Sequence, residues 1–239
     1  MPIYLFTDFG GSDIYAGQVR AALLKGAPRQ PVIDLLHDAP AFEVKASAHL
    51  LAALVMRIPA GAVVLGVVDP GVGGARDSVV VRADGKWLVG PDNGLLSVSA
   101  SRAVHSEVYT IGWRPKELSA SFHGRDLFAP VAAMLARGNR RAAKLRRSSF
   151  ATNLGPQDID EVIYVDHYGN VMTGLRAVKL NSSDVVRVNG KSIRHAGVFS
   201  EVPRGELFWY ENSLGLVEIA SNAASARTIL GMAVGDLLG

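Results

Sequence analysis

The sequence predicts an α/β fold in two domains: an N-terminal α/β domain with a mostly parallel central sheet, and a small, barrel-like C-terminal all-β domain. In the first half, short apolar runs typical of buried strands alternate with segments whose apolar residues recur at helical spacing. From Asp160 onward the chain consists of short strand-like stretches and turns, with few residues able to form a helix. The pattern changes near residues 153–157, so we expect domains at 1–155 and 156–239.

The expected elements follow from apolar runs and the residues that flank them. Residues 3–7 form an apolar run that ends at Asp8, which indicates a strand, and residues 15–25 have helical spacing and stop at Gly26. Buried strands are expected at 31–36 and 62–68, a hairpin at 78–82 and 86–89 around the Asp-Gly pair at 84–85, a strand at 108–111, and helices at 43–57 and 125–137. In the second domain we expect strands at 162–165, 173–175, 185–188, 207–211 and 216–219.

Three carboxylates directly follow expected strands of the first domain. They are Asp8, Asp69 and Asp92. Ligands of open α/β sheets bind beyond the carboxyl ends of the strands. The sequence therefore predicts a binding site at one edge of this sheet, with these three side chains around it.

Composition excludes several classes of function. The chain has 239 residues, no cysteine and a formal net charge of +3, so disulfide and thiolate chemistry are excluded and a metal would need His and carboxylate ligands. No apolar run reaches the ~18 residues of a membrane helix, and no signal-peptide pattern is present, so we expect a cytoplasmic protein without membrane contact. Basic residues cluster at 137–147. Because no aromatic stacking platform accompanies them, we expect a solvated helix end and no nucleic-acid partner.

Four segments combine glycine with Asp, Asn, His or Arg, at 7–10, 69–76, 91–94 and 122–126. Each one alone is also an ordinary turn sequence. DPGVGG lacks the Gly-Lys-Ser/Thr of a phosphate-binding Walker loop, and DFG lacks the other kinase motifs. Together they bring a carboxylate, a guanidinium and an imidazole to one edge, which suits the activation of water. The residues alone predict a hydrolase or lyase.

These segments also carry a resemblance that runs along the whole chain. The motifs are TDFG at 7–10, DPGVG with a following Arg at 69–76, PDNGLL at 91–96, FHGRDLFAP at 122–130, DHYGNV at 166–171 and NSLGLVEIASNAASA at 212–226. In them the sequence resembles the S-adenosylmethionine (SAM) hydroxide adenosyltransferases, the hydrolase branch of the family that includes the fluorinase and chlorinase. The resemblance implies that water or hydroxide attacks the ribose C5′ of SAM, releasing adenosine and methionine, with no cofactor and no metal.

The resemblance also implies roles for individual residues. Asp69 would orient and polarise the water, Arg76 would fix Asp69, and His123 would position the water or take its proton. Asp8 matches a carboxylate that holds the ribose hydroxyls, and Asp13 a residue near the methionine amine. Further substrate-binding positions that it implies are Phe42, Asn93, Asp166, Tyr168, Asn170, Phe199, Ser213, Asn222 and Ala223. The family site lies between the N-terminal domain of one subunit and the C-terminal domain of a neighbour, which implies a homotrimer.

Two departures separate the chain from the halogenases. These enzymes carry an aromatic residue in place of Asp69 and a serine in place of Gly124, and a carboxylate beside the attacking group repels halide. Leu214 stands where the fluorinase has an arginine, which leaves open how the methionine carboxylate is held. Three alternatives remain at this point: a nucleoside-binding or SAM-binding protein with little turnover, a SAM-dependent halogenase and a metal-dependent hydrolase.

Overall fold

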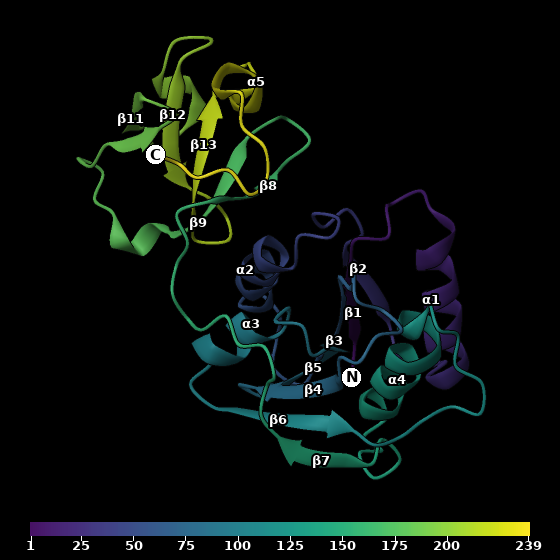
Figure 1. Cartoon of the computed structure of the whole chain (residues 1–239). Coiled ribbons are helices and arrows are strands. Elements are labelled where there is room, and N and C mark those ends of the chain that lie inside the picture. The colour runs from purple at the N-terminus through teal and green to yellow at the C-terminus, as the bar shows by residue number, and fades with distance from the viewer. The chain divides into compact units, whose positions relative to one another are not determined.

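The computed structural model describes residues 1–239, which divide into two compact units, Met1–Pro156 and Gln157–Gly239 (Figure 1). The α/β class is confirmed, because the first unit combines helices with a seven-stranded sheet and the second is built on a six-stranded sheet. No helix has the length and apolar character needed to cross a membrane. No group of three or more His, Asp or Glu side chains is arranged to hold a metal ion.

The sheet of the first unit has the strand order β2-β1-β3-β5-β4-β6-β7. Strands β2, β1, β3 and β5 pair in parallel, and β4, β6 and β7 continue the sheet with antiparallel pairing. The predicted hairpin joins β4 to β5, and its turn has positive φ at Asp84 and Gly85 (44° and 79°), as a tight hairpin turn requires. The bounds are β1 Ile3–Thr7, β2 Val32–Leu36, β3 Val63–Val67, β4 Ser78–Ala83, β5 Lys86–Pro91, β6 Ser106–Ile111 and β7 Leu145–Ser148.

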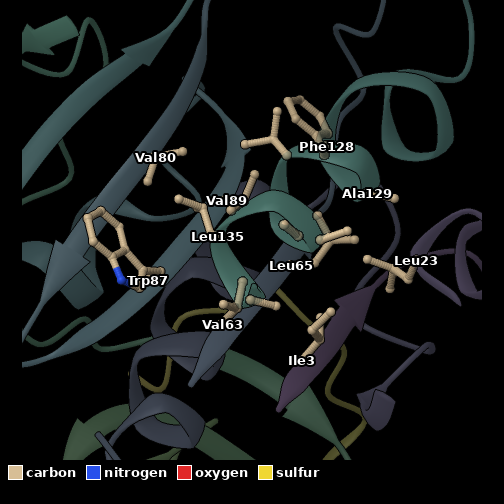
Figure 2. Close-up of a cluster of buried hydrophobic side chains, with 14 of the residues drawn as sticks. Ile3, Leu23, Val63, Leu65, Val80, Trp87, Val89, Phe128, Ala129 and Leu135 are labelled. Carbon is tan, nitrogen blue, oxygen red and sulfur yellow. The ribbon is translucent and has the colours of Figure 1, made fainter. Parts of the chain in front are cut away.

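Helices cover both faces of this sheet. On one face α1 (Ile14–Gly26) packs with α4 (Ala129–Ala136), and on the other α2 (Val44–Val55) packs with α3 (Ser97–Arg102) (Figure 1). Figure 2 shows the core under α1 and α4, where buried side chains of the strands meet those of the two helices. The parallel pairing of β1, β3 and β5 places their carboxyl ends side by side.

Three features of the first unit differ from the sequence prediction. Strand β2, expected to be buried, is an edge strand that pairs with β1, and Ile33 is 39% exposed. The helix expected at 125–137 begins as a π-helical segment, Gly124–Phe128, and continues as α4. The prediction missed α3 and β7, which have six and four residues and are too short to show a clear period.

The second unit has the strand order β10-β11-β12-β13-β9-β8. Its core includes Trp209, Val217 and Ile219, which are nearly or fully buried. The prediction missed β11 and the short helix α5, which Ser225 caps with its side chain. The bounds are β8 Val162–Val165, β9 Val171–Arg176, β10 Val186–Val188, β11 Lys191–His195, β12 Leu207–Glu211, β13 Leu216–Ser221 and α5 Ala226–Leu230.

Candidate active site

A cavity of about 290 Å³ lies at the carboxyl end of the parallel strands in the first unit. Asp8 lines it from the loop after β1, and Asp69 from the loop after β3. His123, which directly precedes the π-helical segment Gly124–Phe128, also lines it. The cavity is therefore where the sequence predicted a site, beyond the strand ends of an α/β sheet.

Asp69 and Arg76 form a two-pronged ion pair beside this cavity. The Nε of Arg76 donates to Asp69 Oδ1 at 2.9 Å, and its Nη2 pairs with Asp69 Oδ2. The side chain of Asp69 is 4% exposed, and that of Arg76 is 11% exposed. The Arg76 guanidinium also lies over the ring of Phe128, 5.3 Å from its centroid. A bidentate pair of this kind fixes the carboxylate in one orientation.

His123 is tied to the same arginine, and this contact determines its tautomer. The Nη2 of Arg76 lies 3.0 Å from Nδ1 of His123. Arginine has donors and no acceptor, so Nδ1 accepts and the proton of the neutral imidazole is on Nε2. Burial, and then the positive charge of Arg76, lowers the pKa of His123 from 6.5. Within the trio, Asp69 is therefore a carboxylate acceptor and His123 is a neutral imidazole donor.

Close contact between two loops holds this trio in place. Gly73 has φ of 79°, and a Cβ built on it would lie 2.3 Å from the carbonyl oxygen of Ala120. The loop after β3 therefore contacts the loop before His123 without an intervening side chain. The second loop is anchored in turn, because Asp126 Oδ2 accepts from the backbone N–H of Ser119 at 3.0 Å.

The structure brings three further predicted residues to the cavity: Asp8, Asp13 and Phe42. Burial raises the pKa of Asp8 from 3.8, and the backbone N–H of Phe42 donates to its Oδ2 at 3.4 Å. Phe42 is 74% exposed and has φ of 68°, a left-handed conformation that is rare for an aromatic residue. Asp13 caps α1, since its Oδ1 accepts from Ile14 N at 2.6 Å.

An aromatic wall of this cavity is missing from the sequence prediction. Phe9, Tyr15 and Phe122 contact one another with ring centroids 5.3–5.9 Å apart. All three line the cavity. They come from the β1 loop, from α1 and from the loop before His123, so no single motif contains them. The position of Phe9 and Phe122 beside Asp8 and His123 is the signal that could have found two of them.

Two predicted residues near the end of β5 turn away from the cavity. Asp92 is 4% exposed, and its Oδ2 accepts from the backbone N–H of Ala151 at 3.0 Å. The Nδ2 of Asn93 donates to the carbonyl of Val68 at 2.9 Å, and its Oδ1 accepts from Leu95 N at 3.2 Å. Both side chains connect loops. Of the three strand-end carboxylates expected around one site, Asp8 and Asp69 line the cavity and Asp92 does not.

The remaining predicted residues belong to the second unit, where a cavity of about 520 Å³ is lined by Tyr168, Asn170, Phe199 and Ala223. Asp166 organises its first loop, because its Oδ1 accepts from the backbone N–H groups of Tyr168 and Asn170, each at 2.9 Å. The cavity also contains Ser221, which the prediction missed. Its Oγ is buried and has no hydrogen-bond partner.

Two predicted residues of the second unit, Asn222 and Ser213, do not line this cavity. The Nδ2 of Asn222 donates to the carbonyl of Val202 at 2.7 Å, which holds the backbone next to Ala223. Ala223 itself has φ of 55°. Ser213 is exposed in the turn after β12 and does not line the cavity.

Comparisons with known proteins match both units. The model of the SAM hydroxide adenosyltransferase N-terminal domain matches residues 3–145, and that of the C-terminal domain matches residues 160–238. The chain is 38% identical to an (R)-S-adenosyl-L-methionine hydrolase of Thermus thermophilus, covering 98% of this chain and 97% of that one. It is 38% identical to another of that name from Salinispora arenicola, over 97% and 94% of the two chains.

A solved structure supports the same relationship. An uncharacterized conserved protein from Thermotoga maritima superimposes with a TM-score of 0.87 at 33% identity, over 98% of this chain and 97% of that one. The two matched domains, the end-to-end relatives and the fold agree, and this chain belongs to the SAM hydroxide adenosyltransferase family.

Proposed function

We propose that this protein hydrolyses SAM to adenosine and methionine. The observation that carries the proposal is the Asp69–Arg76–His123 arrangement beside a cavity at the strand ends. A carboxylate acceptor and an imidazole donor, both held by one arginine, are the groups needed to orient a water molecule. The names of the relatives from Thermus thermophilus and Salinispora arenicola describe the same activity.

The reaction is a substitution at the ribose C5′. The water oxygen forms a bond to C5′ while the bond from C5′ to sulfur breaks, and the electron pair of that bond neutralises the sulfonium. One proton leaves the attacking water. Methionine departs as a neutral thioether, so the leaving group needs no acid and the step needs no cofactor. Catalysis then depends on placing water, carbon and sulfur in line.

The donor pattern of the trio supports a role for each residue. Asp69 accepts a hydrogen bond from the water and is the acceptor toward which its proton moves. His123 presents Nε2–H, because its Nδ1 accepts from Arg76, and it therefore positions the water as a donor. Arg76 holds both partners and makes no contact with the substrate in this scheme. Of the two roles that the resemblance left open for His123, the geometry supports positioning.

Around the trio, Asp8 holds the ribose hydroxyls as an ionised acceptor, Asp13 receives the methionine amine and Phe42 packs on the nucleoside. The aromatic cavity of the second unit, with Tyr168 and Phe199, suits a nucleobase. We propose a homotrimer in which this second cavity completes the site of a neighbouring subunit. The exposure of Phe42 (74%) and Tyr168 (76%) supports it, since exposed aromatic residues around a cavity are typical of surfaces that a partner or ligand covers.

Hydrolysis in oxygen-18 water tests the function. We expect labelled adenosine and unlabelled methionine, because solvent oxygen enters at C5′. Asp69→Asn should retain adenosine binding by calorimetry and lose most turnover. Unlabelled adenosine would overturn the mechanism. Adenosine binding without turnover of SAM by the unaltered protein would instead identify a nucleoside-binding module.

A further inference from the structure

A chain of hydrogen bonds runs from the surface of α1 to the loop that carries Asp8, through a histidine outside the cavity. Thr7 Oγ1 lies 2.7 Å from Nδ1 of His37, and His37 Nε2 lies 3.0 Å from Asp34 Oδ1. Arg20 Nε donates to the same oxygen at 3.0 Å, and its Nη2 pairs with Asp34 Oδ2. Thr7 is fully buried and His37 is 8% exposed.

The direction of each hydrogen bond in this chain follows from its partners. Asp34 is paired with an arginine and accepts, so His37 Nε2 carries a proton. Burial, and then the positive charge of Arg20, lowers the pKa of His37, so the ring is neutral and its Nδ1 is an acceptor. The Thr7 hydroxyl must then donate to Nδ1, which leaves its oxygen lone pairs for the backbone N–H of Phe9, 3.4 Å away. This series of hydrogen bonds therefore fixes the rotamer of Thr7 and the orientation of the peptide group that follows Asp8.

Backbone contacts join the same two segments. Gly10 N donates to the carbonyl of His37 at 2.7 Å, and Ala39 N donates to the carbonyl of Thr7 at 3.1 Å. The loop after β1 is thus held on both sides of Asp8 by the segment after β2. Asp8 lies between these two contacts and lines the cavity.

From this geometry we infer that His37 is a positioning residue for recognition of the ribose, acting through Thr7 to set the direction of the Asp8 carboxylate. The inference rests on the proposed function, which assigns Asp8 to the ribose hydroxyls. A carboxylate binds two neighbouring hydroxyls only when its two oxygens point toward them. A displacement of about 1 Å is enough to weaken such binding.

Matched variants of Thr7 separate this role from a general effect on folding. Thr7→Val removes the hydroxyl and keeps the shape, whereas Thr7→Ser keeps the hydroxyl. His37→Phe removes the acceptor, and His37→Asn retains an acceptor near the position of Nδ1. Thr173→Val is the control, because Thr173 is also fully buried and its hydroxyl donates to the Val217 carbonyl at 2.8 Å, in the second unit.

Each protein is assayed with SAM and with its 2′-deoxy analogue. For Thr7→Val and His37→Phe we expect KM for SAM to rise about tenfold with kcat changed less, and the effect to shrink to about twofold or less with the analogue, as coupled partners behave. Thr7→Ser and His37→Asn should recover much of the loss, and Thr173→Val should affect both substrates alike. Equal losses with both substrates, or no loss with SAM, would overturn the inference.

The same comparison distinguishes failure of the inference from failure of the proposed function. If the unaltered protein releases no adenosine from SAM, the proposed function fails, and calorimetry with adenosine and 2′-deoxyadenosine replaces the assay. The inference then requires that Thr7→Val weaken adenosine binding more than 2′-deoxyadenosine binding. An equal effect on the two nucleosides would overturn it.

Discussion

His123 belongs to the trio as a neutral imidazole, because Arg76 donates to its Nδ1 and because burial and the Arg76 charge lower its pKa from 6.5. Protonation would place a second N–H opposite the arginine, where no acceptor is available. We therefore expect kcat/KM to fall as the pH drops through the lowered pKa, with the acid limb of the profile below pH 6.5. Initial rates over mildly acidic to neutral pH check this.

His123→Gln is the matched variant for this prediction, since its amide N–H can replace Nε2–H and does not titrate. We expect it to keep part of the activity and to lose the limb that belongs to His123. An acid limb unchanged in His123→Gln would assign the titration to another group, such as Asp8, whose pKa burial raises from 3.8, and would contradict the prediction.

Arg76 acts through its shape as well as its charge. Its fork holds both oxygens of Asp69 and reaches His123, whereas a lysine provides a single point charge. We expect Arg76→Lys to lower kcat about 100-fold with little change in KM, the cost typical of a misplaced reacting group. Arg147→Lys is the control, because that arginine pairs with Glu107 on the surface with its side chain 75% exposed. Similar activity in Arg76→Lys and Arg147→Lys would remove the role given to Arg76.

The sequence could predict which carboxylates leave the sheet at its carboxyl edge, because that depends on strand ends alone. It could not predict which way they turn. Asp92 follows β5 as Asp69 follows β3, but its oxygen meets the backbone of Ala151, 59 positions further along the chain. The partnership of Thr7 with His37 was invisible for the same reason, since it depends on the register of β1 against β2.

Among the loops, the contact of Gly73 with Ala120 joins two segments of the trio, and it offers a test at the level of elements. A side chain at Gly73 meets both an unfavourable φ of 79° and a carbonyl oxygen 2.3 Å from its Cβ. We expect Gly73→Ala to lower stability by about 2–4 kcal/mol and to lower kcat, since the loops must separate. Thermal unfolding and turnover measure the two effects.

Gly61→Ala is the control for this loop contact. Gly61 has φ of 83°, close to that of Gly73, but a Cβ there meets nothing within 4 Å. The control should lose only the conformational cost, about 1 kcal/mol, and keep its turnover. Equal losses of stability and activity at the two glycines would show that the loop contact contributes nothing.

At the same scale, elements with a continuous apolar signal were predictable, whereas short helices and polar edge strands were not. Helix α2 buries nine of its twelve residues, and β3 is buried throughout, so both show a clear apolar signal. Strand β7 has the sequence LRRS, and its charged residues suit an edge strand but resemble a loop. The π-helical segment after His123, Gly124–Phe128, has no sequence pattern that distinguishes it from an α-helix.

In the whole molecule, each unit has its own apolar core. One cluster contains Leu65 and Phe128 of the first unit, and another contains Trp209 and Ile219 of the second. In the sequence, the spacing of apolar residues changes from helical to strand-like near residues 153–157. The pattern of residues does not indicate whether the two groups of predicted binding residues belong to one site, because it carries no information about a neighbouring subunit.

Mixing two inactive variants tests the proposed assembly directly. Asp69→Asn damages the trio of the first unit, and Tyr168→Ala removes an aromatic group from the cavity of the second. If each site joins the first unit of one subunit to the second unit of its neighbour, trimers reassembled from equal amounts should contain intact sites in about a quarter of positions. Activity should then return on mixing, in particles of about three times the 25.4 kDa chain by light scattering. Sites built within single chains would remain damaged in every mixture, so trimers that regain no activity would refute the shared site, and monomers would refute the trimer.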